Sequence, residues 1–452
     1  MNPETGRISG CIGSLGSALR GNMQKQMKGE CSMGLILGID LCDSFSQISV
    51  YSPEKHAPEP LLLGGSESNG MISTTLCKVR GEDRWLIGTE AYQRALMGEG
   101  TMVDKLVKIL MRGTSATIEG VQYGAVDLMA AFISQLIRLP KIVYKEEEIE
   151  SIAFGLRQLD PDLLDRLTEA CDICGLERDR VHFLSHTECF AYYVANQPKE
   201  LWPNAVSAFD LNDAGLDYFE MKAVRGRRPQ ILQANREPLD EAFDLDLLET
   251  PMGEHMADTI LSACADRMLQ KKLVSSIFLT GEGFTSVDWA KEFLRKLCMK
   301  RKVFSGQHLF ADGAALVAYD SALPESRFPY LCLCEGRLAS TISLFALKDG
   351  RNEQLILAQA GSNWYEAKAS AEFILDDVHT LELVVTPFAT QHVETISLSL
   401  DELPARPNKT TRIEVIVSFA SENRVTVRVV DKGFGDLFPA SGIVIRKDFL
   451  IS

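Results

Sequence analysis

Hydrophobic residues follow two different periods along the chain, and the change of period divides the chain. From Met33 to about Ala322, short apolar runs typical of buried strands alternate with runs of helical period, which predicts an α/β domain. After the proline-containing segment 323–329 the period becomes two, which predicts an all-β sandwich. We expect helices at residues 103–112, 123–139, 162–175, 254–272 and 289–300. We expect sandwich strands at residues 339–346, 355–360, 380–385, 394–400, 412–419 and 424–430.

These patterns predict a division into 1–32, 33–324 and 325–452. Residues 1–32 are rich in Gly, Ser, Asn and Gln without sustained periodicity, so we expect a disordered leader there. Met33 directly precedes the first apolar run and is an alternative start of translation.

Two segments share one pattern, an apolar run, then Asp-Leu, then a short polar turn into a second apolar run. They are residues 35–50, with Asp40, and residues 206–217, with Asp210. Such a hairpin can bring backbone N–H groups to a phosphate while the aspartate orients a hydrated Mg²⁺. The same pattern also fits an ordinary β-hairpin.

A third segment, 275–288, is expected to be a buried strand that enters a Gly-x-Gly turn. Gly281 and Gly283 carry no side chain, so a flat adenine or ribose could lie against that turn. Residues 308–319 then form a helix rich in small residues, suited to close packing.

The order of these elements resembles that of the actin and DnaK-type chaperone superfamily, with hairpin, helix, hairpin, adenosine turn and closing helix. The segment Gly38-Ile-Asp-Leu is similar to the chaperones' opening motif, and 181–193 resembles the helix that closes their first lobe. Segments 412–419 and 425–435 resemble the last strands of their substrate-binding sandwich. The resemblance covers roughly 33–452 and is that of a divergent bacterial heat-shock chaperone family.

The resemblance implies an actin-like two-lobed nucleotide-binding domain with ribonuclease H-like lobes, followed by a β-sandwich. It implies ATP or ADP with Mg²⁺ as cofactor, Asp40 and Asp210 as metal-site residues, and Lys108 as the catalytic lysine, with Lys105 as its rival. The implied nucleotide-binding residues are Asp40, Cys42, Asp43, Asn212, Asp213, Gly215, Gly281 and Gly283.

Several positions depart from the family. Cys42 and Asp43 replace the glycines of the first turn, and Asn212-Asp213-Ala214-Gly215 replaces Gly-Gly-Gly-Thr in the second. An added carboxylate repels a triphosphate unless a cation bridges them. The water-orienting glutamate aligns with Ser185, and Glu188 could substitute for it only if the register slips. The outer part of the second lobe is reduced to a short segment, and the sandwich lacks the family's helical lid.

These departures predict a degenerate DnaK-like protein, a nucleotide-binding or pseudo-ATPase module whose sandwich binds a protein or peptide, with weak or absent ATP hydrolysis. One alternative is an active ATP-hydrolysing chaperone that uses Lys108, Asp40 and Asp210, with Glu188 or Asp213 in place of the lost groups. Another is a purely structural scaffold without nucleotide.

The composition of the chain limits the classes of partner and the cell compartments that we expect. The net charge of −15 argues against a nucleic-acid partner. No apolar stretch reaches the ~18 residues of a membrane span. Eleven scattered cysteines without a disulfide framework suggest a reducing cytoplasm. Cys171 and Cys174 have metal-ligand spacing but no second ligand pair, and the seven histidines, His182 and His186 among them, are expected to be structural.

Overall fold

The computed structural model describes residues 12–13, 34–63, 69–146, 148–224, 226, 228–241, 243–348, 350–388 and 392–451. The chain forms two compact units, Met1–Tyr330 and Leu331–Ser452. The sequence pattern placed this boundary between 324 and 325. The predicted leader lies outside the described residues except for β1 (Ile12–Gly13), which pairs with a strand of the second sheet of unit 1.

The first sheet of unit 1 has one central strand, β2 (Leu35–Leu41). It runs parallel to β11 and antiparallel to β3. The sheet order is β12 (Val181–Ser185), β11 (Ile149–Leu156), β2, β3 (Phe45–Ser52) and β4 (Ala57–Pro60), with β5 (Ile72–Ser73) beside β3. Its helices are α3 (Ala125–Tyr144), α4 (Pro161–Ile173) and α5 (His186–Ala195).

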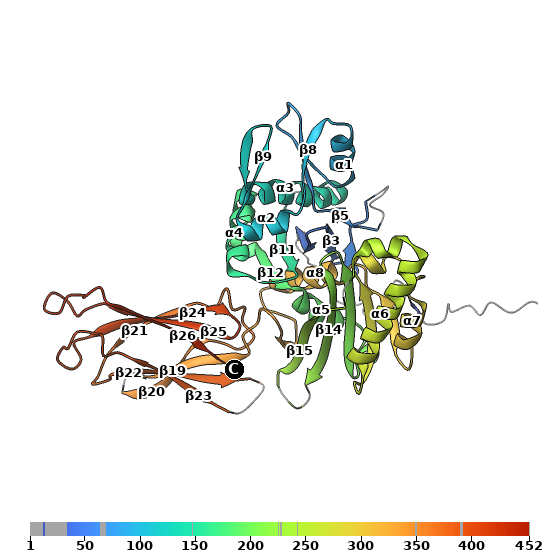
Figure 1. Cartoon of the computed structure of the whole chain (residues 1–452). Coiled ribbons are helices and arrows are strands. Elements are labelled where there is room, and N and C mark those ends of the chain that lie inside the picture. The colour runs from blue at the N-terminus through green and yellow to red at the C-terminus, as the bar shows by residue number, and fades with distance from the viewer. Residues whose placement is uncertain are drawn as a thin grey trace, which may run out of the picture. The chain divides into compact units, whose positions relative to one another are not determined.

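The second sheet repeats the first in order and in strand direction. Its central strand, β13 (Ala205–Asn212), runs parallel to β16 and antiparallel to β14. The first six strands of this seven-stranded sheet lie in the order β1, β17 (Lys302–Ser305), β16 (Val274–Thr280), β13, β14 (Gly215–Val224) and β15 (Gln230–Leu239). Its helices are α6 (Pro251–Leu269), α7 (Lys291–Leu297) and α8 (Leu309–Ser321). Each half thus begins with three strands in a meander, which are followed in the chain by a helix, a strand, a helix, a strand and a last helix (Figure 1).

The first half carries an insertion between β5 and α3, which we call the outer segment. It contains a three-stranded sheet, two short helices and a hairpin. These elements are β6 (Leu76–Val79), β7 (Trp85–Ile87), α1 (Gly88–Leu96), β8 (Gly100–Val103), α2 (Leu106–Arg112), β9 (Ser115–Ile118) and β10 (Val121–Gly124). In the second half, β15 leads to α6 through the 3₁₀ turn Leu245–Glu249.

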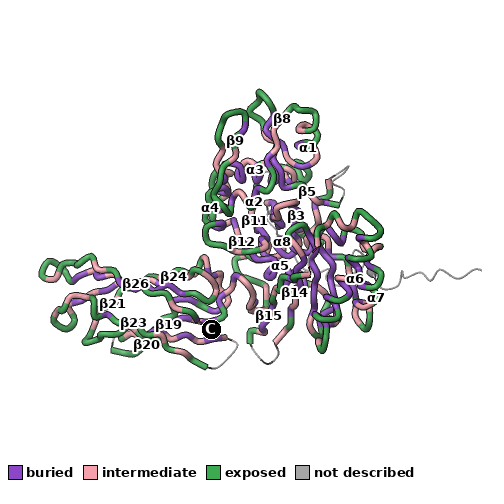
Figure 2. The backbone as a smooth tube through the Cα atoms, in the orientation of Figure 1, coloured by how far each residue is buried: buried purple, intermediate pink, exposed green. Residues whose placement is uncertain are grey.

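The last helix of each half bridges the two halves. Helix α8 follows the second sheet but packs on β2, β3 and β11 of the first, while α5 follows the first sheet and also contacts β14 and β15. The two helices cross closely, because a Cβ at Gly313 would lie 2.1 Å from the Cys189 carbonyl oxygen. A Cβ at Gly38 would lie 2.1 Å from the Ala315 nitrogen, so α8 rests directly on β2. This junction is buried in Figure 2.

Unit 2 contains two four-stranded antiparallel sheets. One comprises β20 (Arg351–Ala358), β19 (Ser340–Lys348), β22 (Thr380–Pro387) and β23 (Glu394–Ser399), and the other β21 (Ala369–Ile374), β24 (Arg412–Ser421), β25 (Arg424–Asp431) and β26 (Val444–Leu450). Alternate residues such as Val425, Val427 and Val429 are fully buried, as the period of two requires. Strand β18 (Tyr330–Leu333) lies at the unit boundary.

Some expected element bounds were wrong. Residues 181–193 are not one helix, since 181–185 form β12 and α5 begins at His186. Helix α2 begins at Leu106 rather than 103, and α7 covers only Lys291–Leu297 of the expected 289–300. Strands β21 and β26 were not expected. Among the described residues, no helix is both long and apolar enough to cross a membrane.

We predict that Gly313→Ala destabilises the protein by at least about 2 kcal/mol, although alanine is the better helix former, because the helices must separate to admit the methyl group. Chemical denaturation measures the effect. The control is Gly306→Ala, where the new Cβ would lie 3.3 Å from the Leu309 side chain and meet no backbone atom this closely. Equal stability of the two variants would contradict the close crossing.

Candidate functional site

The two hairpin turns of the repeated halves face each other. Asp40 and Asp210 lie near the ends of the equivalent central strands β2 and β13, and both are buried. The Ser44 hydroxyl of the first turn donates a hydrogen bond to Asp213 Oδ1 of the second, at 2.9 Å. The turns that the sequence assigned to phosphate binding are therefore joined to each other.

Asp40 belongs to a cluster with Cys42 and His186. His186 Nε2 lies 2.8 Å from Asp40 Oδ1 and 4.0 Å from Cys42 Sγ, and Cys42 Sγ lies 3.4 Å from the same Asp40 oxygen. His186 is the first residue of α5 and is fully buried. Its ring stacks on Phe310 of α8 with centroids 3.9 Å apart, which fixes its orientation. Burial, with the charges of Asp40 and Asp210, raises the pKa of the Cys42 thiol well above its usual range.

Asp210 is the matching carboxylate of the second hairpin. The Asn212 side-chain amide donates a hydrogen bond to Asp210 Oδ2 at 2.9 Å. Burial raises the pKa of Asp210 to about 7; His186 opposes this, and the carboxylates of Asp217 and Asp40 add to it. Asp210 therefore exchanges its proton near neutral pH.

Lys108, the expected catalytic lysine, lies on α2 and is half exposed. Its ammonium forms a 3.0 Å ion pair with Asp43 Oδ2, and its backbone N–H donates to Asp43 Oδ1 at 3.0 Å. Asp43 thus ties the first turn to the start of α2. The rival Lys105 occupies the N-cap position of that helix in a left-handed conformation.

The glycines of the expected adenosine turn pack against the protein itself. Gly281 has φ +92°, and a Cβ there would lie 2.4 Å from Asp210 Oδ1. A Cβ at Gly283 would lie 2.5 Å from Leu211 Cδ2. Both glycines therefore let the turn approach the end of β13. Gly215, with φ +121°, opens β14 beside the second turn.

Ser185 and Glu188 have a local structural role. The Ser185 hydroxyl accepts a hydrogen bond from the Glu188 backbone N–H at 3.1 Å and caps α5. The spacing of the two residues is that of a capping box. Glu188 is fully buried in the first turn of the helix.

Arg157, which follows β11, holds the second hairpin against the first half. Its Nε donates to Asp217 Oδ2 at 2.8 Å, and its Nη1 donates to the Ala214 carbonyl at 2.7 Å. Asp217 is fully buried, and Arg236 approaches its other oxygen to 4.0 Å.

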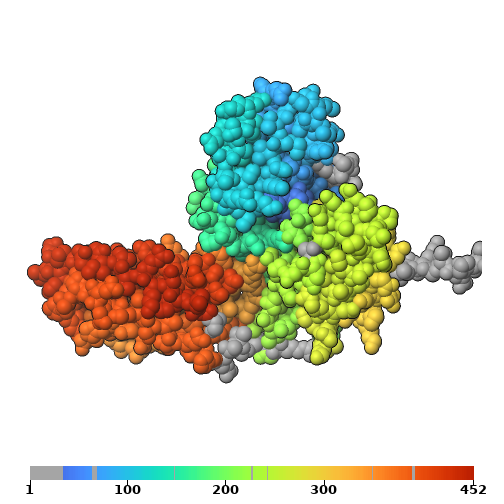
Figure 3. Space-filling model, viewed as in Figure 1, coloured from blue at the N-terminus to red at the C-terminus, as the bar shows by residue number. Residues whose placement is uncertain are grey.

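In Figure 3, dark blue residues of the first sheet remain visible between the cyan outer segment and the yellow-green second half.

The side chains at the turns do not fit Mg-ATP. A triphosphate would have to displace the Ser44–Asp213 hydrogen bond and approach the carboxylates of Asp43 and Asp213. Burial, and then the nearby Asp213 carboxylate, raise the pKa of Glu282, so a further carboxyl group lies close to this turn. Lys108, the lysine that the resemblance assigned to catalysis, is paired with Asp43. Phosphate groups could enter these turns only after these contacts are broken.

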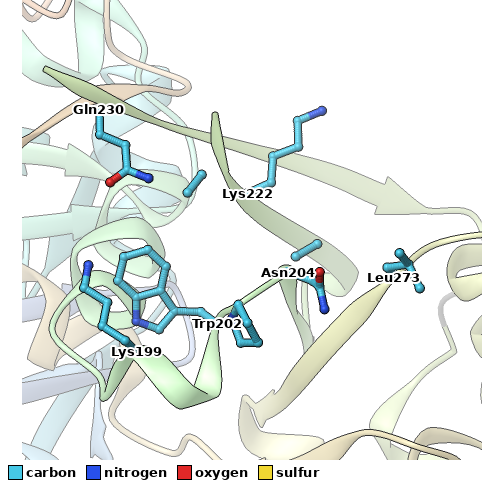
Figure 4. A pocket seen from close by; sticks show the side chains of 9 residues that line it. Lys199, Trp202, Asn204, Lys222, Gln230 and Leu273 are labelled. Carbon is cyan, nitrogen blue, oxygen red and sulfur yellow. The ribbon is translucent and has the colours of Figure 1, made fainter. Parts of the chain in front are cut away.

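A separate open pocket of about 710 Å³ lies near the other ends of the second-sheet strands. Figure 4 shows Lys199, Trp202, Lys222 and Gln230 around it. The Lys199 ammonium lies 3.9 Å from the Trp202 ring centroid, a cation–π contact. One of the two lysines that line the pocket is therefore already engaged.

The sequence did not reveal three contributors, Ser44, Arg157 and His186. The sequence predicts one helix over residues 181–193, whereas β12 ends at Ser185 and His186 follows it directly. The ends of strands are where α/β proteins present functional side chains. Ser44 and Arg157 act across more than 50 residues, and no local pattern marks such contacts.

Comparison with known families gives two matches. A family model described as "Family of unknown function (DUF5716) C-terminal" matches residues 57–335. A second, described as "Domain of unknown function (DUF8552)", matches residues 337–451. No curated protein matches the chain. The two matched regions meet close to the boundary between the two compact units.

We predict that Arg157→Gln destabilises the protein by about 2–3 kcal/mol, because it leaves the buried Asp217 without its closest cation. Urea denaturation gives the free energy of unfolding. Adding Asp217→Asn should recover part of the loss. The control is Arg178→Gln, which removes an exposed pair with Asp172 and should cost less than about 1 kcal/mol. Equal stability of the two arginine variants would show that Arg157 does not stabilise the buried Asp217.

Proposed function

The chain belongs to the DUF5716 C-terminal family of unknown function, and we propose that it is a protein-binding scaffold built on a degenerate actin/DnaK-like fold without ATP turnover. The repeated order and direction of the strands in the two sheets support this fold. The exchange of α5 and α8 between the halves supports a two-lobed arrangement.

The hydrogen bond between Ser44 and Asp213 is the observation that carries the proposal. Phosphoryl transfer depends on positioning and on neutralisation of phosphate charge. Here the second turn presents a carboxylate to the first, Lys108 is paired with Asp43, and Glu188 is buried in the α5 helix. These positions argue against a role for Lys108 or Glu188 in stabilising a transferring phosphoryl group.

Unit 2 supplies an apolar surface suited to a protein partner. Phe345 and Leu347 of β19 are 63% and 69% exposed, and Ile356 of β20 is 57% exposed. Pairing in the hairpin places these three side chains on one face, since Ile356 lies opposite Ser343 and β-strand residues two apart share a face. Exposed apolar patches commonly mark interaction sites. The described cysteines form no disulfide bonds, which favours a reducing, cytoplasmic location.

We predict that millimolar Mg-ATP or Mg-ADP leaves the melting temperature unchanged relative to Mg²⁺ alone, and that no phosphate is released. A ligand at 100 times its dissociation constant would add about 2.7 kcal/mol to stability, which a melting curve resolves easily. Stabilisation without turnover would instead favour a nucleotide-binding pseudo-ATPase. Turnover that Asp40→Asn abolishes would favour the active chaperone and overturn the proposal.

We also predict that replacing both Phe345 and Leu347 by serine weakens binding of a labelled, uncharged, extended apolar peptide at least tenfold in fluorescence anisotropy. The replacement removes most of the exposed apolar area of the patch. The control is Leu450→Ser, an equally exposed leucine on the other sheet. Unchanged binding by the double variant would exclude the patch as the binding surface.

A further inference from the structure

We propose that Asp40, Cys42 and His186 form a binding site for a thiolate-preferring transition metal ion, with Zn²⁺ as the best match. The site lies where the sequence resemblance placed Mg²⁺ and phosphate. The inference does not depend on the proposed function, since metal binding is measured without nucleotide.

The spacing of the three donor atoms suits a tetrahedral ion. Zinc binds nitrogen and oxygen at about 2.0–2.2 Å and sulfur at about 2.3 Å, which separates tetrahedral ligand atoms by about 3.3–3.6 Å. The observed separations are 2.8 Å for His186 Nε2 to Asp40 Oδ1, 3.4 Å for Cys42 Sγ to Asp40 Oδ1, and 4.0 Å for Cys42 Sγ to His186 Nε2. Shifts of about half an ångström would bring all three to ideal distances, which is within the reach of side-chain rotation.

The chemistry of the donors selects the metal. Thiolate and imidazole bind Zn²⁺ and similar ions, whereas Mg²⁺ requires an octahedron of oxygen ligands. Asp210 is close enough to interact electrostatically with Cys42, His186 and Asp40. A water would complete the tetrahedron as the fourth ligand, because among the described residues the donor atoms that lie within 4.8 Å of one another are those of Asp40, Cys42 and His186. The set of Asp, Cys and His thus suits a site with one open or exchangeable position.

Two of the three ligands lie on regular secondary structure, Asp40 on β2 and His186 on α5, whereas Cys42 lies in the turn after β2. Asp40 is held in the middle of the first sheet, and His186 begins α5 beside the helix crossing. Phe310 orients the His186 ring by stacking, while the buried Nδ1 has no hydrogen-bond partner among the described residues. Metal-binding histidines usually donate a hydrogen bond from the second nitrogen, and loss of such a partner costs ten- to a hundredfold in affinity. We therefore expect weaker binding than at a four-ligand structural zinc site.

The test is titration of the metal-free full-length chain with Zn²⁺ against a competing chelator, and with Co²⁺ followed by absorption. We expect one ion per chain and a thiolate-to-cobalt charge-transfer band. Cys42→Ser should abolish the band, and His186→Gln should weaken binding at least tenfold. Cys298→Ser, which alters another half-buried cysteine, should bind normally.

A second measurement needs no variant. Zn²⁺ should protect Cys42, and not Cys298, from alkylation in the native chain, as read by mass spectrometry of peptides. Variants are compared only after circular dichroism confirms their fold. Absence of stoichiometric binding, a cobalt spectrum without a thiolate band, full binding by Cys42→Ser, or unprotected Cys42 would each overturn the proposal.

Discussion

The close crossing of α5 and α8 is the constraint on which the rest of unit 1 depends. It exists because Gly313 leaves room for the Cys189 carbonyl, and it lets each helix serve the sheet of the other half. Phe310 on α8 and His186 on α5 each lie three residues before this contact, and their rings stack on each other. The crossing that joins the halves therefore also sets the position of the histidine in the Asp40 cluster.

The repeated topology brings two equivalent hairpins together, and the side chains then decide what the junction can do. With small turns it would leave space for a ligand. Here Ser44, Asp213 and Arg157 fill the junction with hydrogen bonds between the halves. The buried aspartates remain, but their neighbours are a thiol, an imidazole and an amide. The junction between the two hairpins is thus held together by the protein's own side chains.

The sequence predicted much of the element order, because apolar periodicity is a local property. It located both aspartate hairpins and the change to alternating strands after residue 329. It missed β26, whose centre reads Arg-Lys-Asp and exposes most of its side chains, because an edge strand need not alternate clearly. It predicted that Gly281 leaves space for a ligand, whereas Asp210 occupies the space beside that glycine. The sequence shows that a side chain is absent there, but only the three-dimensional structure shows which group lies in the space.

Asp43 uses both of its carboxylate oxygens on α2, one on the Lys108 backbone and one on its ammonium. This double attachment is a mechanical link between the outer segment and the first turn. Any displacement of the outer segment must either break both bonds together or carry the turn with it. Asp43 therefore couples the position of α2 to that of the loop that holds Cys42 and Ser44.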